Sequence, residues 1–180
     1  STCYISEQVL CVDYRATNSS SFAENAFVLP TNIRKVKEYI LKKGYAVSKV
    51  DIVGHSMGGI LSRLYLQSSC YDNDIHKLIT VNTPHSGSQG ANVLVELPSI
   101  RAKFGLNGKA VDDLQVTSFA TRTLLNGRSV LNKATVPSHA IVTKTSAISS
   151  GAGRDLFGML LQIAYQLEYP EKDIETITSD

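Results

Sequence analysis

The chain has 180 residues, enough for one domain that buries a substantial hydrophobic core. Its 43% hydrophobic and 19% charged residues exclude an intrinsically disordered segment. The net charge of +2 comes from dispersed lysines and arginines, so nucleic acid is not an expected partner. No apolar run reaches the roughly 20 residues of a transmembrane helix. We therefore expect no membrane-spanning segment, and composition leaves a secreted and a cytoplasmic location equally open.

The first half of the chain alternates short apolar runs with stretches of helical periodicity. Residues 9–12 form the first predicted strand, and residues 31–43 form a predicted helix that ends in two lysines and a glycine. Residues 49–53 follow as a second strand. From residue 57 the apolar positions recur at helical spacing, and residues 77–82 form a third strand. Strand, helix, strand, helix, strand is the signature of a parallel sheet with right-handed crossovers.

The second half continues this alternation after an interruption. Residues 140–143 are predicted as a strand, residues 156–167 as a helix and residues 174–178 as a last short strand. We therefore expect a single α/β domain over residues 1–180, with a mostly parallel sheet and helices on both of its faces. Residues 86–136 are too long for an ordinary connection and are amphipathic in pieces. We interpret them as a helical cap over a site, and the alternative is an extra packing subdomain.

The clearest motif lies directly between the second strand and its helix. It reads Gly54-His55-Ser56-Met57-Gly58-Gly59 and matches the G-x-S-x-G nucleophile elbow. In such an elbow a strained turn lifts the serine hydroxyl above the sheet, so Ser56 is the predicted nucleophile. Gly54 and Gly58 are expected where strand and helix leave no room for side chains. The Met57 amide, at the start of the helix, is positioned to stabilise an oxyanion.

This motif and the end of the next strand resemble a known group of enzymes. Residues 50–59 resemble the elbow of bacterial triacylglycerol lipases, and Thr83-Pro84-His85-Ser86-Gly87-Ser88 is similar to a motif of those lipases and of the GPI inositol-deacylase-like esterases. The resemblance covers residues 9–90 well. It implies an α/β-hydrolase fold, a Ser-Asp-His triad and hydrolysis of a carboxylic ester. It also implies an upstream loop with a second oxyanion donor and a late histidine, so we expect the domain to be incomplete at both ends.

The acid and the base of the implied triad are sought after the predicted strands. Asp180 follows the last predicted strand and is the expected acid, or its immediate neighbour. Asp112 and Asp113 are interpreted as helix-capping residues within the cap. Of the four histidines, only His85 emerges at the carboxyl edge of the sheet beside Ser56. As part of a fixed turn, His85 is expected to brace the site, and the base is expected outside the chain.

Three functions remain compatible with these motifs. The first is a serine esterase or lipase that acts on a small-molecule ester or a lipid through an acyl-enzyme on Ser56. The second is a hydrolase-fold binding protein without catalysis, and the third is an acyltransferase on the same elbow. No cofactor and no metal site are expected, because the three cysteines have no metal-ligand spacing. Cys11 is interpreted as a small core residue.

Overall fold

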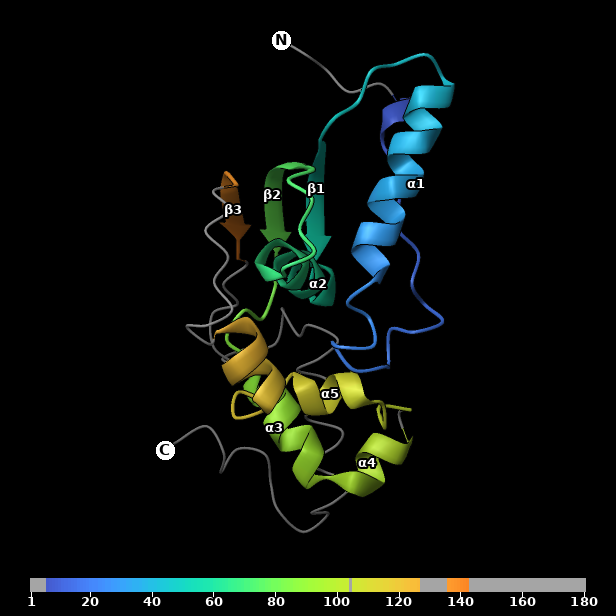
Figure 1. Cartoon of the computed structure of the whole chain (residues 1–180). Helices are drawn as coiled ribbons and strands as arrows, with labels where there is room; N and C mark the ends of the chain where they lie inside the picture. The colour runs from blue at the N-terminus through green and yellow to red at the C-terminus, as the bar shows by residue number, and fades with distance from the viewer. Residues whose placement is uncertain (1–5, 104, 127–135, 143–180) are drawn as a thin grey trace, which may run out of the picture.

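The computed structural model describes residues 6–103, 105–126 and 136–142 (Figure 1). In these ranges three strands are present, β1 (Val50–His55), β2 (Ile75–Val81) and β3 (Ser138–Ile141). The α-helices are α1 (Val28–Lys42), α2 (Met57–Gln67), α3 (Gln89–Glu96), α4 (Pro98–Lys103) and α5 (Lys109–Asp113). A 3₁₀-helix, η1 (Ser6–Gln8), and a π-helix, η2 (Ala120–Leu125), complete the described elements.

The three strands form a parallel sheet in the order β1-β2-β3. Val53 of β1 pairs with Ile79 of β2, which in turn pairs with His139 of β3. The strands predicted at residues 49–53 and 77–82 are confirmed, and the one predicted at residues 140–143 begins two residues earlier. All three strands point in one direction, so their carboxyl ends meet at one edge (Figure 1).

Helix α1 begins earlier than its sequence predicts and ends as expected. It starts at Val28, so Pro30 lies within the first turn, where a missing amide hydrogen costs no helical hydrogen bond. At its end Gly44 adopts a positive φ of 85°. The Gly44 amide donates to the carbonyl of Leu41, and the Tyr45 amide donates to that of Ile40. These two bonds form the Schellman motif that the lysine–glycine ending predicts.

Helices α1 and α2 pack together on one face of the sheet. Leu29 and Ile33 of α1, Tyr65 of α2 and Ile75 of β2 form a buried cluster there. On the opposite face the side chain of Val53 is 69% exposed. Helices are expected on that face too, because parallel sheets are normally covered on both sides, but none lies there among the described residues.

The strand predicted at residues 9–12 is absent from the described structure. These residues pair with no strand, and Val9 is 64% exposed. Cys11 is also exposed, so its interpretation as a core residue is wrong. A short apolar run shows only that a strand would be tolerated, whereas a strand forms only where a partner offers its backbone groups.

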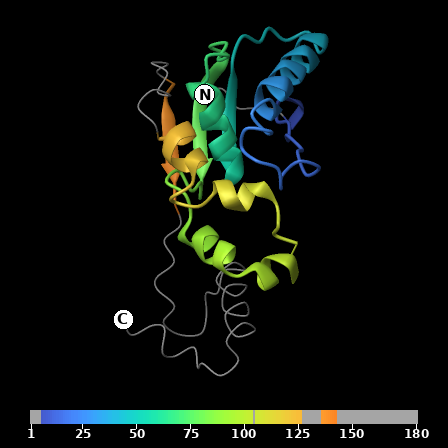
Figure 2. The same cartoon turned by 60° about the horizontal axis from the view of Figure 1, so that its bottom comes forward.

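The helical segment (residues 89–125, containing α3, α4, α5 and η2) lies beyond the carboxyl ends of the strands (Figures 1 and 2). Leu94, Leu97 and Ile100 form a small core of its own. At its other end, Ala120 and Leu125 of η2 pack with Phe22 and with Ile60 of α2. The segment is therefore attached to the sheet layer through α2. The helix predicted at residues 156–167 and the strand predicted at residues 174–178 lie outside the described residues.

Candidate active site

Ser56 occupies a strained turn between β1 and α2. Its φ of 50° and ψ of −123° lie outside the regions that L-amino acids commonly adopt. Such a conformation costs on the order of 1–3 kcal/mol and persists only when the surrounding structure imposes it. Here the Ser56 amide continues the sheet ladder by donating to the carbonyl of Val81 at 2.9 Å. Although Ser56 is the N-cap of α2, its hydroxyl makes no capping hydrogen bond to the helix.

Two glycines leave room for close packing at this turn. A Cβ on Gly54 would lie 2.7 Å from Cα of Gly59, and a Cβ on Gly59 would overlap the side chain of Thr83. A Cβ on Gly58, in contrast, would meet only the Tyr14 hydroxyl, at 3.9 Å, an ordinary contact distance. The crowding expected at Gly54 and Gly58 is therefore found at Gly54 and Gly59.

The start of α2 follows Ser56 directly. Met57 is the first residue of the helix, so its amide N–H points out of the helix end. The partial positive charge of that end stabilises negative charge nearby. This arrangement can stabilise an oxyanion that develops on a substrate attacked by Ser56.

His85 lies beside the carboxyl edge, and its ring contacts Thr80. Its Nε2 atom lies 3.1 Å from Oγ1 of buried Thr80. Burial lowers the pKa of His85, and the nearby positive charge of Arg63 lowers it further. The His85 carbonyl accepts hydrogen bonds from Arg63 Nη1 at 3.3 Å and Asn126 Nδ2 at 3.2 Å. His85 thus connects the loop after β2 to α2 and to the end of η2, as expected of a bracing residue.

The other three histidines are placed elsewhere on the sheet. His55 is the exposed last residue of β1, His76 in β2 bonds Asp51 at 2.8 Å, and His139 lies on β3. Among the described residues, no hydrogen bond joins any of the four histidines to Ser56.

Of the candidate acids, two lie within the helical segment. Asp112 and Asp113 are the last residues of α5, so their interpretation as helix caps is wrong. Asp112 bonds Arg101 at 2.8 Å, and Asp113 accepts a hydrogen bond of 2.6 Å from the Phe22 amide. Asp112 therefore stabilises the helical segment itself, and Asp113 connects the segment to Phe22. Asp180 lies outside the described residues.

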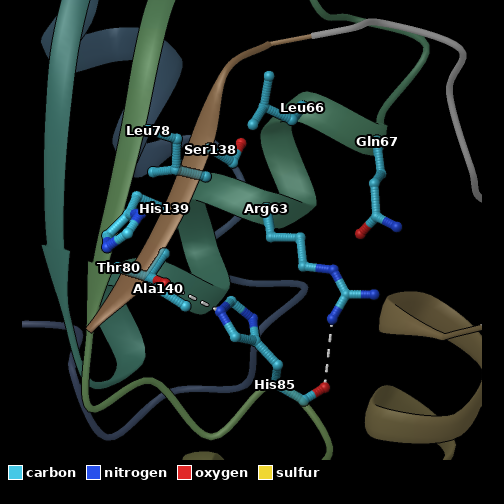
Figure 3. Close-up of a pocket in the computed structure, with 9 residues that line it drawn as sticks. All are labelled: Arg63, Leu66, Gln67, Leu78, Thr80, His85, Ser138, His139 and Ala140. Carbon is cyan, nitrogen blue, oxygen red and sulfur yellow. Dashed lines mark hydrogen bonds between the residues drawn. The ribbon is translucent and has the colours of Figure 1, made fainter. Parts of the chain in front are cut away.

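A hollow of about 420 Å³ opens between α2 and the strands β2 and β3 (Figure 3). Arg63 and Gln67 of α2 line one side, Thr80 and His85 another, and Ser56 is not part of it. Within the described ranges, no cluster of three or more His, Cys, Asp or Glu side chains could hold a metal ion. None of the described helices is long and apolar enough to cross a membrane.

Comparison with known proteins agrees with this geometry. The PGAP1-like alpha/beta domain family matches residues 11–96, which contain β1, the elbow, α2 and β2. The mature lipase BlEst2 of Bacillus licheniformis is similar in structure, with a TM-score of 0.53 and 22% identity over 85% of this chain. The chain spans 58% of the length of that lipase. No curated protein matches the chain. The expected parallel α/β architecture is confirmed at the level of the fold.

Proposed function

Since the chain has the lipase-like α/β-hydrolase fold, we propose that it is a serine hydrolase that cleaves carboxylic esters through an acyl-enzyme on Ser56. Fold alone does not determine activity, so the proposal depends on the site. The observation that carries it is the conformation of Ser56, whose positive φ raises a serine with an unused hydroxyl above the start of α2. Strain of this kind is found where a reacting group must be held in place.

The reaction follows from the groups around Ser56. Its Oγ atom attacks the ester carbonyl carbon, a general base takes the hydroxyl proton, and the carbonyl oxygen becomes an oxyanion beside the Met57 amide. The alcohol then leaves with that proton. Water next attacks the acyl carbon while the base takes a proton from it, and the acid is released when the bond to Ser56 Oγ breaks and the proton returns to that oxygen. Asp180 is proposed as the carboxylate that orients the base.

The helical segment is proposed as a cap that contacts the substrate, a small-molecule ester or a lipid. It lies at the carboxyl edge of the sheet, where ligands of open α/β sheets bind (Figure 2). Leu94 and Leu125 are buried in packing, so they are unsuited to contact an acyl chain. Val93 and Phe119 are 44% and 71% exposed, and among the described residues of the segment they are the large apolar side chains available to do so.

The test is hydrolysis of p-nitrophenyl butyrate by the complete protein and by its Ser56→Ala variant. Loss of the nucleophile costs on the order of 10⁶ in kcat in a well-studied serine hydrolase, and a loss of about that size is expected here. Exposed Ser69, two residues beyond the end of α2, provides the matched Ser69→Ala control, which should keep full activity. Turnover that survives Ser56→Ala would contradict the proposal.

The same assay separates the alternative functions. With an added alcohol acceptor, release of mainly free acid supports a hydrolase, whereas mainly a new ester identifies an acyltransferase. Binding of an ester without any turnover identifies a binding protein.

A further inference from the structure

One polar side chain outside the elbow reaches the first turn of α2. The Tyr14 hydroxyl lies 3.9 Å from the position that a Cβ on Gly58 would take. In a helix the Cα–Cβ bond tilts toward the N-terminus, so a side chain covers the turn that precedes it. The Tyr14 hydroxyl therefore lies over the end of α2 that begins at Ser56.

Two local contacts flank Tyr14. The Arg15 guanidinium bonds the Asp13 carboxylate through Nε at 3.0 Å and through Nη2 at 2.6 Å, and both side chains are exposed. The carbonyl of Tyr14 accepts a hydrogen bond of 2.9 Å from the Thr17 amide, which closes a turn. An exposed ion pair contributes little to stability. The turn includes Tyr14, whose own side chain is half-buried.

The hydroxyl of Tyr14 is available to a ligand. In the described part of the chain no hydrogen bond involves it, and both bonds to Tyr14 from Thr17 go to the backbone carbonyl. Burial raises the pKa of Tyr14 above its usual value of 10.0. The phenol therefore remains protonated at neutral pH and can donate one hydrogen bond.

We propose that the Tyr14 hydroxyl is an additional, side-chain oxyanion donor, which acts together with the Met57 amide on the ester attacked by Ser56. The inference rests on the proposed function. When the bond from Ser56 Oγ to the carbonyl carbon forms, the carbonyl π electrons move to the oxygen, and Tyr14 donates a hydrogen bond to it without transferring its proton. The electrons return to re-form the carbonyl when the bond to the leaving alcohol breaks. A donor of this kind acts on the transition state more than on the bound substrate.

The test is Tyr14→Phe in the complete protein, with kcat and KM for p-nitrophenyl butyrate and the Ki of a trifluoromethyl ketone as readouts. Loss of one oxyanion donor typically lowers kcat by about 10²–10³-fold. We expect a fall of that order, a comparable increase in Ki, a nearly unchanged KM and an unchanged melting temperature. Tyr45→Phe is the matched control, since Tyr45 is 41% exposed and precedes the amino end of β1.

An unchanged kcat in Tyr14→Phe would overturn the inference, as would a lower kcat with an unchanged Ki, because a merely structural tyrosine would not select the transition-state analogue. Labelling of Ser56 by a fluorophosphonate separates the two proposals. If Ser56 of the wild-type protein is not labelled, the proposed function fails. If Ser56 is labelled equally fast in the wild type and in Tyr14→Phe, only the role of Tyr14 fails.

Discussion

The elbow region (residues 50–67 with β2) and the helical segment (residues 89–125) are built in different ways. The elbow depends on backbone fit, because Gly54 allows β1 to approach the backbone of α2 and Gly59 allows α2 to approach Thr83, while the sheet ladder continues to the strained Ser56. The helical segment consists of helices of eight, six, five and six residues that pack around a few leucines. The difference teaches that the proposed nucleophile is held by the backbone of the sheet, while the surface proposed to select substrates is supported by side chains.

Side chains of α2 join the two regions. Arg63 donates to the carbonyl of Leu125 at 2.7 Å and to Asn126 Oδ1 at 2.8 Å. Gln67 also donates to the Leu125 carbonyl, at 3.2 Å. The fully buried Leu125 side chain also packs against Ile60 of α2. If the comparison is correct, changes at this junction should affect both regions, whereas changes within one region should remain local.

The largest effect is expected from Leu125→Ala. Removing a buried leucine typically costs about 2–5 kcal/mol of unfolding free energy, and here the cavity would form between η2 and α2. We expect urea denaturation to show a loss of about 3 kcal/mol, with faster amide exchange in both α2 and the helical segment. Leu94→Ala is the comparison, because Leu94 belongs to the separate core of the segment. Faster exchange confined to the helical segment in both variants would contradict a shared junction.

A smaller effect is expected where the elbow is crowded. Gly54→Ala places a methyl group 2.7 Å from the Gly59 backbone, and overpacking of this kind typically costs about 1–3 kcal/mol. Gly58→Ala should be tolerated, because the space is open and alanine is about 1 kcal/mol more favourable than glycine in a helix. Melting temperatures of both variants check this. A Gly58→Ala variant that is less stable than Gly54→Ala would show that the backbone is crowded at Gly58 and not at Gly54.

The smallest effect concerns the ion pair between Glu24 and Lys109 of α5, at 2.9 Å. The hydrogen bond from Lys109 and those from Ser21 lower the pKa of Glu24 from 4.5 to about 2. Because the folded-state pKa is the lower one, this stabilisation is complete above pH 4.5 and is lost as the pH falls toward 2. Both side chains are exposed, so the effect should be small and weakened by salt. The melting temperature of Glu24→Gln should fall less between pH 5 and pH 3 than that of the wild type, and an identical fall would contradict the assignment.

The sequence predicts the sheet and the elbow better than it predicts their surroundings. The strand at residues 49–53, the helix after it and the raised Ser56 are encoded locally, by an apolar run followed by glycines at fixed spacing. The strand predicted at residues 9–12 does not form. Such a strand needs a partner strand elsewhere in the chain, and periodicity does not report whether one is present. The tight contact at Gly59 depends on Thr83, which lies one strand away.

A local motif identifies Ser56 and Met57 as candidate site residues. It does not identify the role proposed for Tyr14. A tyrosine that directly follows an apolar run is an ordinary feature of a sequence. Its proposed role depends on the position of its hydroxyl beside the first turn of α2, which only the folded structure shows. The bracing role of His85 was predictable, because its place at the end of a strand is part of the sequence, whereas its partners Thr80, Arg63 and Asn126 are not.

The central claim is that Ser56 carries the acyl group during turnover. Its most direct test is the mass of the peptide that contains Ser56. The complete protein is mixed with p-nitrophenyl butyrate, quenched in acid within the first turnovers, digested and analysed by mass spectrometry. The account predicts one butyryl group, on the peptide that contains Ser56, and none in the Ser56→Ala variant. A butyryl group on another residue, or ester hydrolysis that persists in Ser56→Ala, would contradict it.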